Sequence, residues 1–281
     1  MAVIGVSGRM GRAIVSAADE SNEVDVVAGV ASATSKALGS DVGELAGVPP
    51  YGMRVTSDLG AALAVCDVAI DFSNAAATSA NVAAASVARK ALVIGTTGFT
   101  AEVERAVDEA ARHIAVLVAP NTSLGVTLLI ELVRATAKAL PLEFDIEISE
   151  AHHRNKQDAP SGTALALGRA AAEGRGQDLQ KVGVATRGDA GRFAPGGAGA
   201  PHANQTPRRE GDIGFAVTRG GDIVGEHTVL FAGAGEQLVL GHRASDRSIF
   251  ARGALKAAAW LASQPPGRYA MRDVVGYKTA S

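Results

Sequence analysis

The sequence has a single cysteine, Cys66, among its 281 residues. One cysteine excludes an intrachain disulfide, and it also excludes the cysteine-rich sites that hold structural zinc. Because Cys66 stands just before the apolar, strand-like stretch 68–72, we expect a buried thiol without a chemical role.

Aromatic residues and an excess of positive charge are also missing. Aromatic residues make up 4% of the chain, and 27 Lys and Arg against 29 Asp and Glu give a net charge of −2. Nucleic-acid-binding proteins usually carry a basic excess, and proteins that bind single strands stack the bases on aromatic side chains. We therefore expect no nucleic-acid partner.

Long apolar runs are absent as well. The strongest candidate, 125–133, is short and contains Glu131, whereas a membrane-spanning helix needs about 20 apolar residues. Residues 2–6 lead directly into a glycine-containing turn, so no secretory signal is visible. We expect a soluble, cytoplasmic protein with no membrane partner.

The length and the 47% hydrophobic content favour two domains, each with its own core. In the first 120 residues, short β-branched runs alternate with amphipathic stretches, which predicts a Rossmann-like, doubly wound parallel sheet of the α/β class. The predicted strands are 2–6, 24–30, 68–72, 91–95 and 114–119, and the predicted helices are 9–18, 75–89 and 101–112.

The pattern changes after residue 121, where a long amphipathic helix over 123–140 precedes a region rich in strands. This region predicts a second α+β domain with a mostly antiparallel or mixed sheet, and residues 219–222 predict a hairpin turn. The predicted strands here are 144–148, 181–186, 213–219, 223–231 and 237–242. Residues 187–211 have the composition of a mobile surface loop.

A further helix over 248–262 has the apolar anchors needed to pack on the first domain. We therefore predict that the first domain comprises 1–123 plus 245–281, and that the second comprises 124–244.

A glycine-containing turn joins the first predicted strand to the first predicted helix. Such a turn lets a pyrophosphate approach the helix N-terminus, although one glycine of the usual dinucleotide motif is replaced here and a purely structural turn remains the alternative. The candidate cofactor residues in it are Gly5, Ser7, Gly8, Arg9, Met10 and Gly11.

The second strand ends in Val30-Ala31-Ser32 and lacks the carboxylate that usually binds a ribose 2′-hydroxyl. Without that carboxylate a 2′-phosphate is not repelled, so the site tolerates or prefers NADPH. Arg9 and Lys36 are the nearest candidate cations, and ordinary surface charges are the alternative.

Two more loops follow predicted parallel strands, at the edge where ligands of such sheets bind. Their hydroxyl, amide and small side chains suit nicotinamide and ribose, with plain turn chemistry as the alternative. The candidate cofactor residues are Gly95, Thr96 and Thr97 in one loop and Ala119, Pro120, Asn121 and Thr122 in the other.

Residues 150–163 combine His152, His153, Arg154 and Lys156 with the helix start Ser161-Gly162-Thr163. Cations at the end of a strand, followed by the free N–H groups of a helix, suit an anionic small molecule, and histidine adds a proton that moves near neutral pH. Adjacent strand residues point to opposite faces, so both histidines face one site only if the strand ends there. Packing roles and a metal site are alternatives, but ligand spacing for a metal is absent.

Five motifs in one order now carry a resemblance to a known family. They are Gly-Val-Ser-Gly-Arg-Met-Gly at 5–11, Gly-Thr-Thr-Gly-Phe at 95–99, Glu-Ala-His-His at 150–153 with Lys156, Asp-Ala-Pro-Ser-Gly-Thr at 158–163, and Gly-Glu-His-Thr at 225–228. Over nearly the whole chain the sequence resembles the 4-hydroxy-tetrahydrodipicolinate (dihydrodipicolinate) reductase family.

The resemblance implies NADPH- or NADH-dependent reduction of 4-hydroxy-tetrahydrodipicolinate to tetrahydrodipicolinate in lysine and diaminopimelate biosynthesis. It implies His152 as the proton donor, Lys156 as the second catalytic residue, and His153, Gly162 and Thr163 as contacts of a dicarboxylate substrate. It also implies that the first domain binds the dinucleotide, and that the second binds substrate and forms a homotetramer. His227 has a structural role in this interpretation.

The chain departs from the family in two places, at Ala31-Ser32 and in a long loop around 193–205. The first departure leaves the cofactor preference open. Two other functions stay open from the residues alone: a dehydrogenase that acts on another imine, and a regulatory protein that binds a dinucleotide without turnover.

Overall fold

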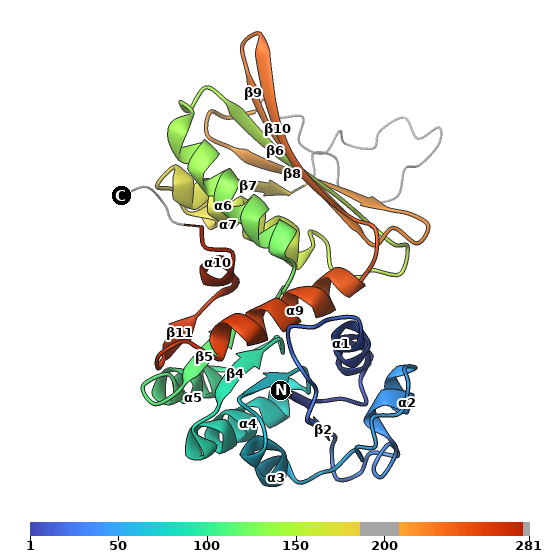
Figure 1. Cartoon of the computed structure of the whole chain (residues 1–281). Coiled ribbons are helices and arrows are strands. Elements are labelled where there is room, and N and C mark those ends of the chain that lie inside the picture. The colour runs from blue at the N-terminus through green and yellow to red at the C-terminus, as the bar shows by residue number, and fades with distance from the viewer. Residues whose placement is uncertain (186–207, 278–281) are drawn as a thin grey trace. The chain divides into compact units, whose positions relative to one another are not determined.

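The computed structural model describes residues 1–185 and 208–277 (Figure 1). They form two compact units: unit 1 comprises Met1–Thr127 and Arg247–Tyr277, and unit 2 comprises the described residues of Leu128–Asp246. Most of the loop predicted over 187–211 lies outside the described residues. No helix in the described ranges has the length and apolar character that a membrane span requires.

Unit 1 is a six-stranded parallel sheet in the order β11-β5-β4-β3-β1-β2, so the predicted Rossmann-like fold is confirmed. Its strands are β1 (Ala2–Ile4), β2 (Ala28–Val30), β3 (Val68–Asp71), β4 (Ala91–Ile94), β5 (Ala115–Val118) and β11 (Gly267–Tyr269). Its helices are α1 (Arg9–Asp19), α2 (Val42–Ala46), α3 (Leu59–Ala64), α4 (Ala75–Ala88), α5 (Ala101–Ala110), α9 (Ser248–Leu261) and α10 (Met271–Val274).

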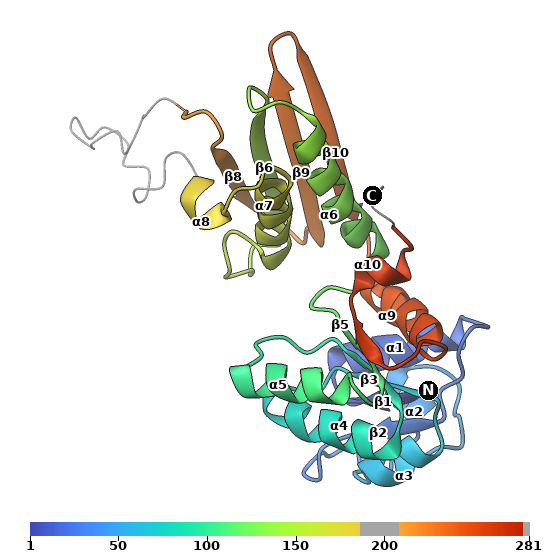
Figure 2. The same cartoon turned by 90° about the vertical axis from the view of Figure 1, so that its left-hand side faces the viewer.

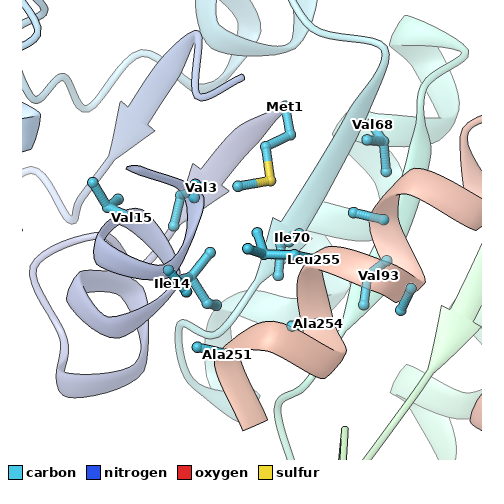
Figure 3. Close-up of a cluster of buried hydrophobic side chains, with 14 of the residues drawn as sticks. Met1, Val3, Ile14, Val15, Val68, Ile70, Val93, Ala251, Ala254 and Leu255 are labelled. Atoms are coloured by element: carbon cyan, nitrogen blue, oxygen red, sulfur yellow. The ribbon is translucent and has the colours of Figure 1, made fainter. Parts of the chain in front are cut away.

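Two apolar clusters hold this sheet between layers of helices. Helices α1 and α9 pack on one face, and α3, α4 and α5 pack on the other (Figures 1 and 2). Figure 3 shows the first cluster, where Ile14 from α1 and Leu255 from α9 meet Ile70 from the sheet. Because Ile14 and Ile70 are fully buried, each contributes about 1.5–3 kcal/mol of burial free energy.

Some predicted boundaries in unit 1 are wrong. The predicted strand over 24–30 is paired only over Ala28–Val30, while the preceding Val27 N–H donates to the Met1 carbonyl. The predicted helix over 101–112 ends at Ala110, and it is capped at its start by the Thr100 hydroxyl, which accepts from Val103 N–H at 3.3 Å. The predicted burial of Cys66 is confirmed, and this burial raises the pKa of its thiol.

Unit 2 is a mixed five-stranded sheet in the order β10-β9-β6-β8-β7. Helices α6 and α7 cover one face of it, around a core that includes Ile146, Ile148 and Phe231 (Figure 2). Its strands are β6 (Asp145–His152), β7 (Gly183–Ala185), β8 (Ile213–Arg219), β9 (Gly225–Gly233) and β10 (Glu236–Ala244), and its helices are α6 (Leu124–Ala139), α7 (Gly162–Gly174) and α8 (Leu179–Val182).

The hairpin predicted at 219–222 is wrong. Strand β6 lies between β8 and β9, parallel to the first and antiparallel to the second. The glycine turn instead crosses the end of β6, where Gly220 N–H donates to the His152 carbonyl and Arg154 N–H donates to the Gly221 carbonyl. The hairpin in this region joins β9 to β10.

The strand predicted over 181–186 is also partly wrong, because residues 181 and 182 belong to α8. The Asp178 side chain accepts from Gln180 N–H at 2.9 Å and starts a helical turn there.

Candidate active site

Unit 1 contains a cavity of about 330 Å³ at the carboxyl ends of β1, β2 and β3. Three consecutive strand ends supply most of its wall, as expected for ligand sites of doubly wound sheets. The wall includes Gly5, Ser7 and Gly8 after β1, Ala31, Ser32 and Ala33 after β2, Phe72, Ser73 and Asn74 after β3, and also Ser57 and Asn81.

The glycines of the first turn are needed for close packing. Gly5 has a φ of +83°, and a Cβ atom there would lie 2.7 Å from the Phe72 carbonyl oxygen. A Cβ atom on Gly11 would lie 2.3 Å from the Gly5 carbonyl oxygen, so Gly11 allows α1 to approach the turn. Gly11 therefore shapes the turn and does not line the cavity.

The N-terminus of α1 has the properties of an anion site. Gly8 is its N-cap, and among the described residues no side chain caps the helix and no acid occupies its first turn. The first N–H groups of a helix have no partner within it, and they favour a phosphate. Arg9, also in this turn, is exposed, and Met10 is half-buried against the core.

The loop after β4 contains Gly95, Thr96 and Thr97 and does not line the cavity. A Cβ atom on Gly95 would lie 2.1 Å from the Phe72 ring, so this glycine makes room for a cavity residue. The Thr96 hydroxyl is buried and has no hydrogen-bond partner among the described residues. A bound ligand with a polar group would satisfy it.

The loop after β5 contains the remaining cofactor candidates. Ala119 N–H donates to the Ile94 carbonyl, the Asn121 side chain accepts from Ser123 N–H, and the Thr122 hydroxyl donates to the Phe250 carbonyl at 2.6 Å. Thr122 thus anchors α9, while Pro120 is exposed. None of these candidates lines the cavity of unit 1.

The loop after β3 is not among the sequence-predicted site residues. Asp71 is fully buried, and its carboxylate accepts from Ser73 N–H and from the Asn81 side-chain amide, both at 2.8 Å. These bonds fix the loop that brings Phe72 and Asn74 to the cavity. A signal was present in the sequence, because Asp71 ends an otherwise apolar run and the polar residues Ser73 and Asn74 follow it.

In unit 2 the buried carboxylate of Glu150 organises a second site. It accepts from Arg219 Nη1 and Nη2 at 2.8 and 2.9 Å and from Ser161 N–H at 2.9 Å, and it lies 2.5 Å from His152 Nδ1. Burial alone would raise the pKa of Glu150, but the hydrogen bonds from Arg219, His152 and Ser161 together lower it. Glu150 is therefore an anion in the folded protein.

His152 is the last residue of β6 and is 8% exposed. Burial lowers the pKa of its imidazole, and Glu150 opposes that shift. The carboxylate fixes the proton on Nδ1, which leaves Nε2 as the atom that exchanges a proton. A Cβ atom on Gly225 would lie 3.1 Å from Nε2, so glycine keeps the space beside this atom open.

His227 supports His152 from β9. Its Nε2 lies 3.1 Å from the Ser161 hydroxyl, and the two imidazole rings meet edge to face at 5.1 Å. Burial lowers the pKa of His227 to about 4, so it is neutral near pH 7. The structural role predicted for His227 agrees with this packing.

Lys156 and the start of α7 form the anionic-ligand part of the site. The strand ends at His152, and Lys156 N–H donates to the His153 carbonyl in the turn that follows. Because His153 lies outside the strand, the two histidines need not point to opposite faces of the sheet. Lys156 Nζ lies 2.9 Å from Asp158 Oδ1. Ser161 caps α7 by accepting from Ala164 N–H, so Gly162 and Thr163 begin the helix with no acid in its first turn.

A doubly wound sheet with an uncapped helix N-terminus at its cavity, together with a buried Glu–His pair near a lysine, defines a dinucleotide-dependent oxidoreductase for an anionic substrate. The family model "Dihydrodipicolinate reductase, N-terminus" matches residues 1–122, and the model for the C-terminus of the same family matches residues 125–275. The chain belongs to the dihydrodipicolinate reductase family.

Curated relatives agree with this membership. A 4-hydroxy-tetrahydrodipicolinate reductase from Ruegeria pomeroyi is 50% identical over 274 residues, covering 98% of this chain and 97% of the relative. A second from Alkalilimnicola ehrlichii is 47% identical over 276 residues, covering 98% of each chain. The fold resembles that of a dipicolinate-bound dihydrodipicolinate reductase from Paenisporosarcina sp. TG-14, with a TM-score of 0.72 and 24% identity over 96% of both chains.

The chain is thus an oxidoreductase that uses NAD(P)H to reduce 4-hydroxy-tetrahydrodipicolinate in lysine and diaminopimelate biosynthesis. This membership favours the reductase over the two other functions left open by the residues.

Proposed function

We propose that His152 donates the proton in this reduction and that Lys156 binds or stabilises the negative charge of the substrate. The observation that carries the proposal is the buried Glu150–His152 pair, whose free Nε2 faces the space that Gly225 leaves open. The bound NAD(P)H supplies the hydride. Protonation of the reduced ring by a positioned acid contributes about a hundred- to ten-thousand-fold to the rate.

The substrate is a dicarboxylate, and the site offers separate groups for its two ends. Lys156 supplies a compact positive charge, while the first N–H groups of α7, at Gly162 and Thr163, donate to a carboxylate as those of helix N-termini do. His153 is half-buried, its carbonyl accepts from Lys156 N–H, and it serves as a further contact. The dipicolinate bound to the Paenisporosarcina reductase is a dicarboxylate of this kind.

We assign cofactor binding to unit 1 and substrate binding to unit 2. The uncapped start of α1, the cavity wall and the unpartnered Thr96 hydroxyl suit a dinucleotide. The cofactor assignment covers Gly5 to Gly11, Gly95 to Thr97 and Ala119 to Thr122. Because the wall after β2 is Ala31-Ser32-Ala33, without a carboxylate, the site accepts NADPH as well as NADH.

A homotetramer formed through unit 2 completes the proposal, together with a cytoplasmic location. The face of the sheet away from the core of unit 2 carries Leu230, which is half-buried, and Val239, which is 56% exposed and lies opposite Leu230 in the β9–β10 pairing. Exposed apolar residues grouped on a sheet favour association. Sedimentation velocity tests the state of assembly, and a monomer at micromolar concentration contradicts it.

A turnover assay tests the residue roles. Pyruvate and aspartate semialdehyde are condensed to form the substrate, NADPH or NADH is added, and the loss of nicotinamide absorbance is followed. We expect His152→Ala and Lys156→Ala each to lose about a hundredfold or more in turnover, yet to bind NADPH normally. Pyridine-2,6-dicarboxylate, which carries two carboxylates on a planar ring, should inhibit the wild type competitively.

Two variants serve as matched controls. His113→Ala and Lys138→Ala remove an exposed histidine in unit 1 and an exposed lysine near the end of α6, and both should keep full turnover. Undiminished turnover in His152→Ala and Lys156→Ala would remove both residues from the mechanism.

A further inference from the structure

The groups assigned to a substrate carboxylate already hold a carboxylate from the protein itself. Lys156 Nζ forms an ion pair with Asp158 Oδ1 at 2.9 Å. The hydrogen bond from Lys156 is the main cause that lowers the pKa of Asp158, and the backbone at Gly162, where α7 begins, adds to the lowering. A substrate carboxylate and the Asp158 carboxylate would compete for Lys156.

We propose that Asp158 is an internal ligand of this anion site, and that a substrate carboxylate binds by displacing it. The inference rests on the proposed function, which assigns Lys156 and Gly162 to the substrate. Asp158 therefore lowers the apparent affinity of the site for any anionic ligand that has to displace it. It is a specificity-determining residue rather than a proton donor.

The burial of the two partners supports displacement. The Asp158 side chain is 60% exposed, whereas the Lys156 side chain is 21% exposed. An ion pair with one partner so open to water is weak, because solvent screens it and the side chain loses rotational freedom. By contrast, the Glu150 side chain is 1% exposed and bonded on three sides, so it stays in place.

The main chain at Asp158 is fixed independently of its carboxylate. Arg219 Nη2 donates to the Asp158 carbonyl at 2.7 Å, and the same guanidinium is held by Glu150. The side chain can therefore rotate away from Lys156 without movement of the backbone. Displacement leaves the Glu150–His152 pair undisturbed.

The variant Asp158→Asn tests the inference, because it keeps the size of the side chain and removes its charge. The inhibition constant of pyridine-2,6-dicarboxylate and the KM of the substrate should both fall, by up to about fivefold, the range expected when a weak competing ion pair is removed. The KM of NADPH should not change. Glu143→Gln, which removes one exposed negative charge before the other end of β6, should change none of these values.

A double variant identifies where the gain arises. In the Lys156→Ala background, Asp158→Asn should no longer tighten pyridine-2,6-dicarboxylate, because the contested cation is gone. A gain that persists there would show a general charge effect and overturn the inference. An inhibition constant that rises or stays constant in Asp158→Asn alone would also overturn it.

A crystal structure of the wild type with pyridine-2,6-dicarboxylate gives a test that does not depend on any variant folding. The inference expects a ligand carboxylate on Lys156 Nζ and the Asp158 carboxylate turned away, and an intact Lys156–Asp158 pair overturns it. Wild-type turnover separates the two proposals. If the wild type shows no turnover, the proposed function fails. If turnover depends on Lys156 but Asp158→Asn changes neither the KM of the substrate nor the inhibition constant, only this inference fails.

Discussion

The two sites of this protein are built from different kinds of atoms. Among the described residues that line the cavity of unit 1, none is charged, and the wall consists of glycine, alanine, serine and other neutral side chains. The site of unit 2 is built around Glu150, His152, Lys156 and Arg219. Under the proposed function, unit 1 would bind its ligand through the backbone, whereas unit 2 would perform the chemistry through placed charges.

This difference also determines which substitutions each site tolerates. Backbone N–H groups keep their direction when a neighbouring neutral side chain changes, so a neutral change at a non-glycine position of the cavity wall should affect binding little. In unit 2, by contrast, each buried charge is balanced by another, and the removal of one partner leaves the other desolvated.

The largest effect should follow from breaking the balanced charges of unit 2. Glu150→Gln removes the anion shared by His152 and Arg219, so we expect the free energy of unfolding to fall by about 3–5 kcal/mol, as for other broken buried pairs. Urea unfolding measures this loss. Glu150 positions His152, so kcat should also fall, whereas the KM of NADPH should stay unchanged.

A pH profile separates this role from a merely structural one. In Glu150→Gln the imidazole of His152 loses the anion that raises its pKa, so His152 loses its proton at a lower pH. Because a proton donor is active only while it is protonated, the basic limb of the kcat profile should move to lower pH. A profile with an unchanged basic limb would show that Glu150 supports the fold alone.

A smaller effect should follow from the pH dependence of stability in unit 2. The pKa of His227 is about 4 in the folded protein and 6.5 when unperturbed, so its contribution is present above pH 6.5 and lost as the pH falls towards 4. Between pH 7 and pH 5 we expect a loss of about 2 kcal/mol from this group. Urea unfolding at the two pH values measures it, and His227→Gln should lose less over the same interval.

The smallest effect should follow from placing a charge in the neutral cavity of unit 1. Ser32→Asp supplies the carboxylate that the end of β2 lacks, and it would repel a 2′-phosphate. We expect the KM of NADPH to rise about tenfold relative to that of NADH. Ser32→Asn is the neutral control, and an equal rise for both cofactors would place Ser32 away from the 2′-position.

Much of unit 1 could be predicted because most of its strands are short, apolar and almost uncharged between amphipathic helices. Strand β11 and helices α2 and α3 could not, because three to six residues are too few to show a period. In unit 2 the Gly220–Gly221 turn has the composition of a hairpin, but turn residues do not reveal which strands flank them. The parallel pairing of β8 with β6 depends on tertiary packing, which the local sequence does not specify.

The site could be predicted where its residues are close together in the chain and not where they are far apart. His152, Lys156 and Gly162 stand in one short block, and their composition alone favours an anionic ligand. Glu150 and Arg219 are separated by 69 positions, and the parallel register that places Arg219 beside His152 brings them together. No sequence pattern within either strand predicts that register.

The most direct test of the central claim is a single-turnover experiment in which wild type and His152→Ala, each saturated with NADPH and in excess over the substrate, are mixed with the substrate. The account predicts that the variant oxidises NADPH at least about a hundredfold more slowly, with an unchanged dissociation constant for NADPH. Equal rates in the two proteins would contradict the assignment of the proton to His152.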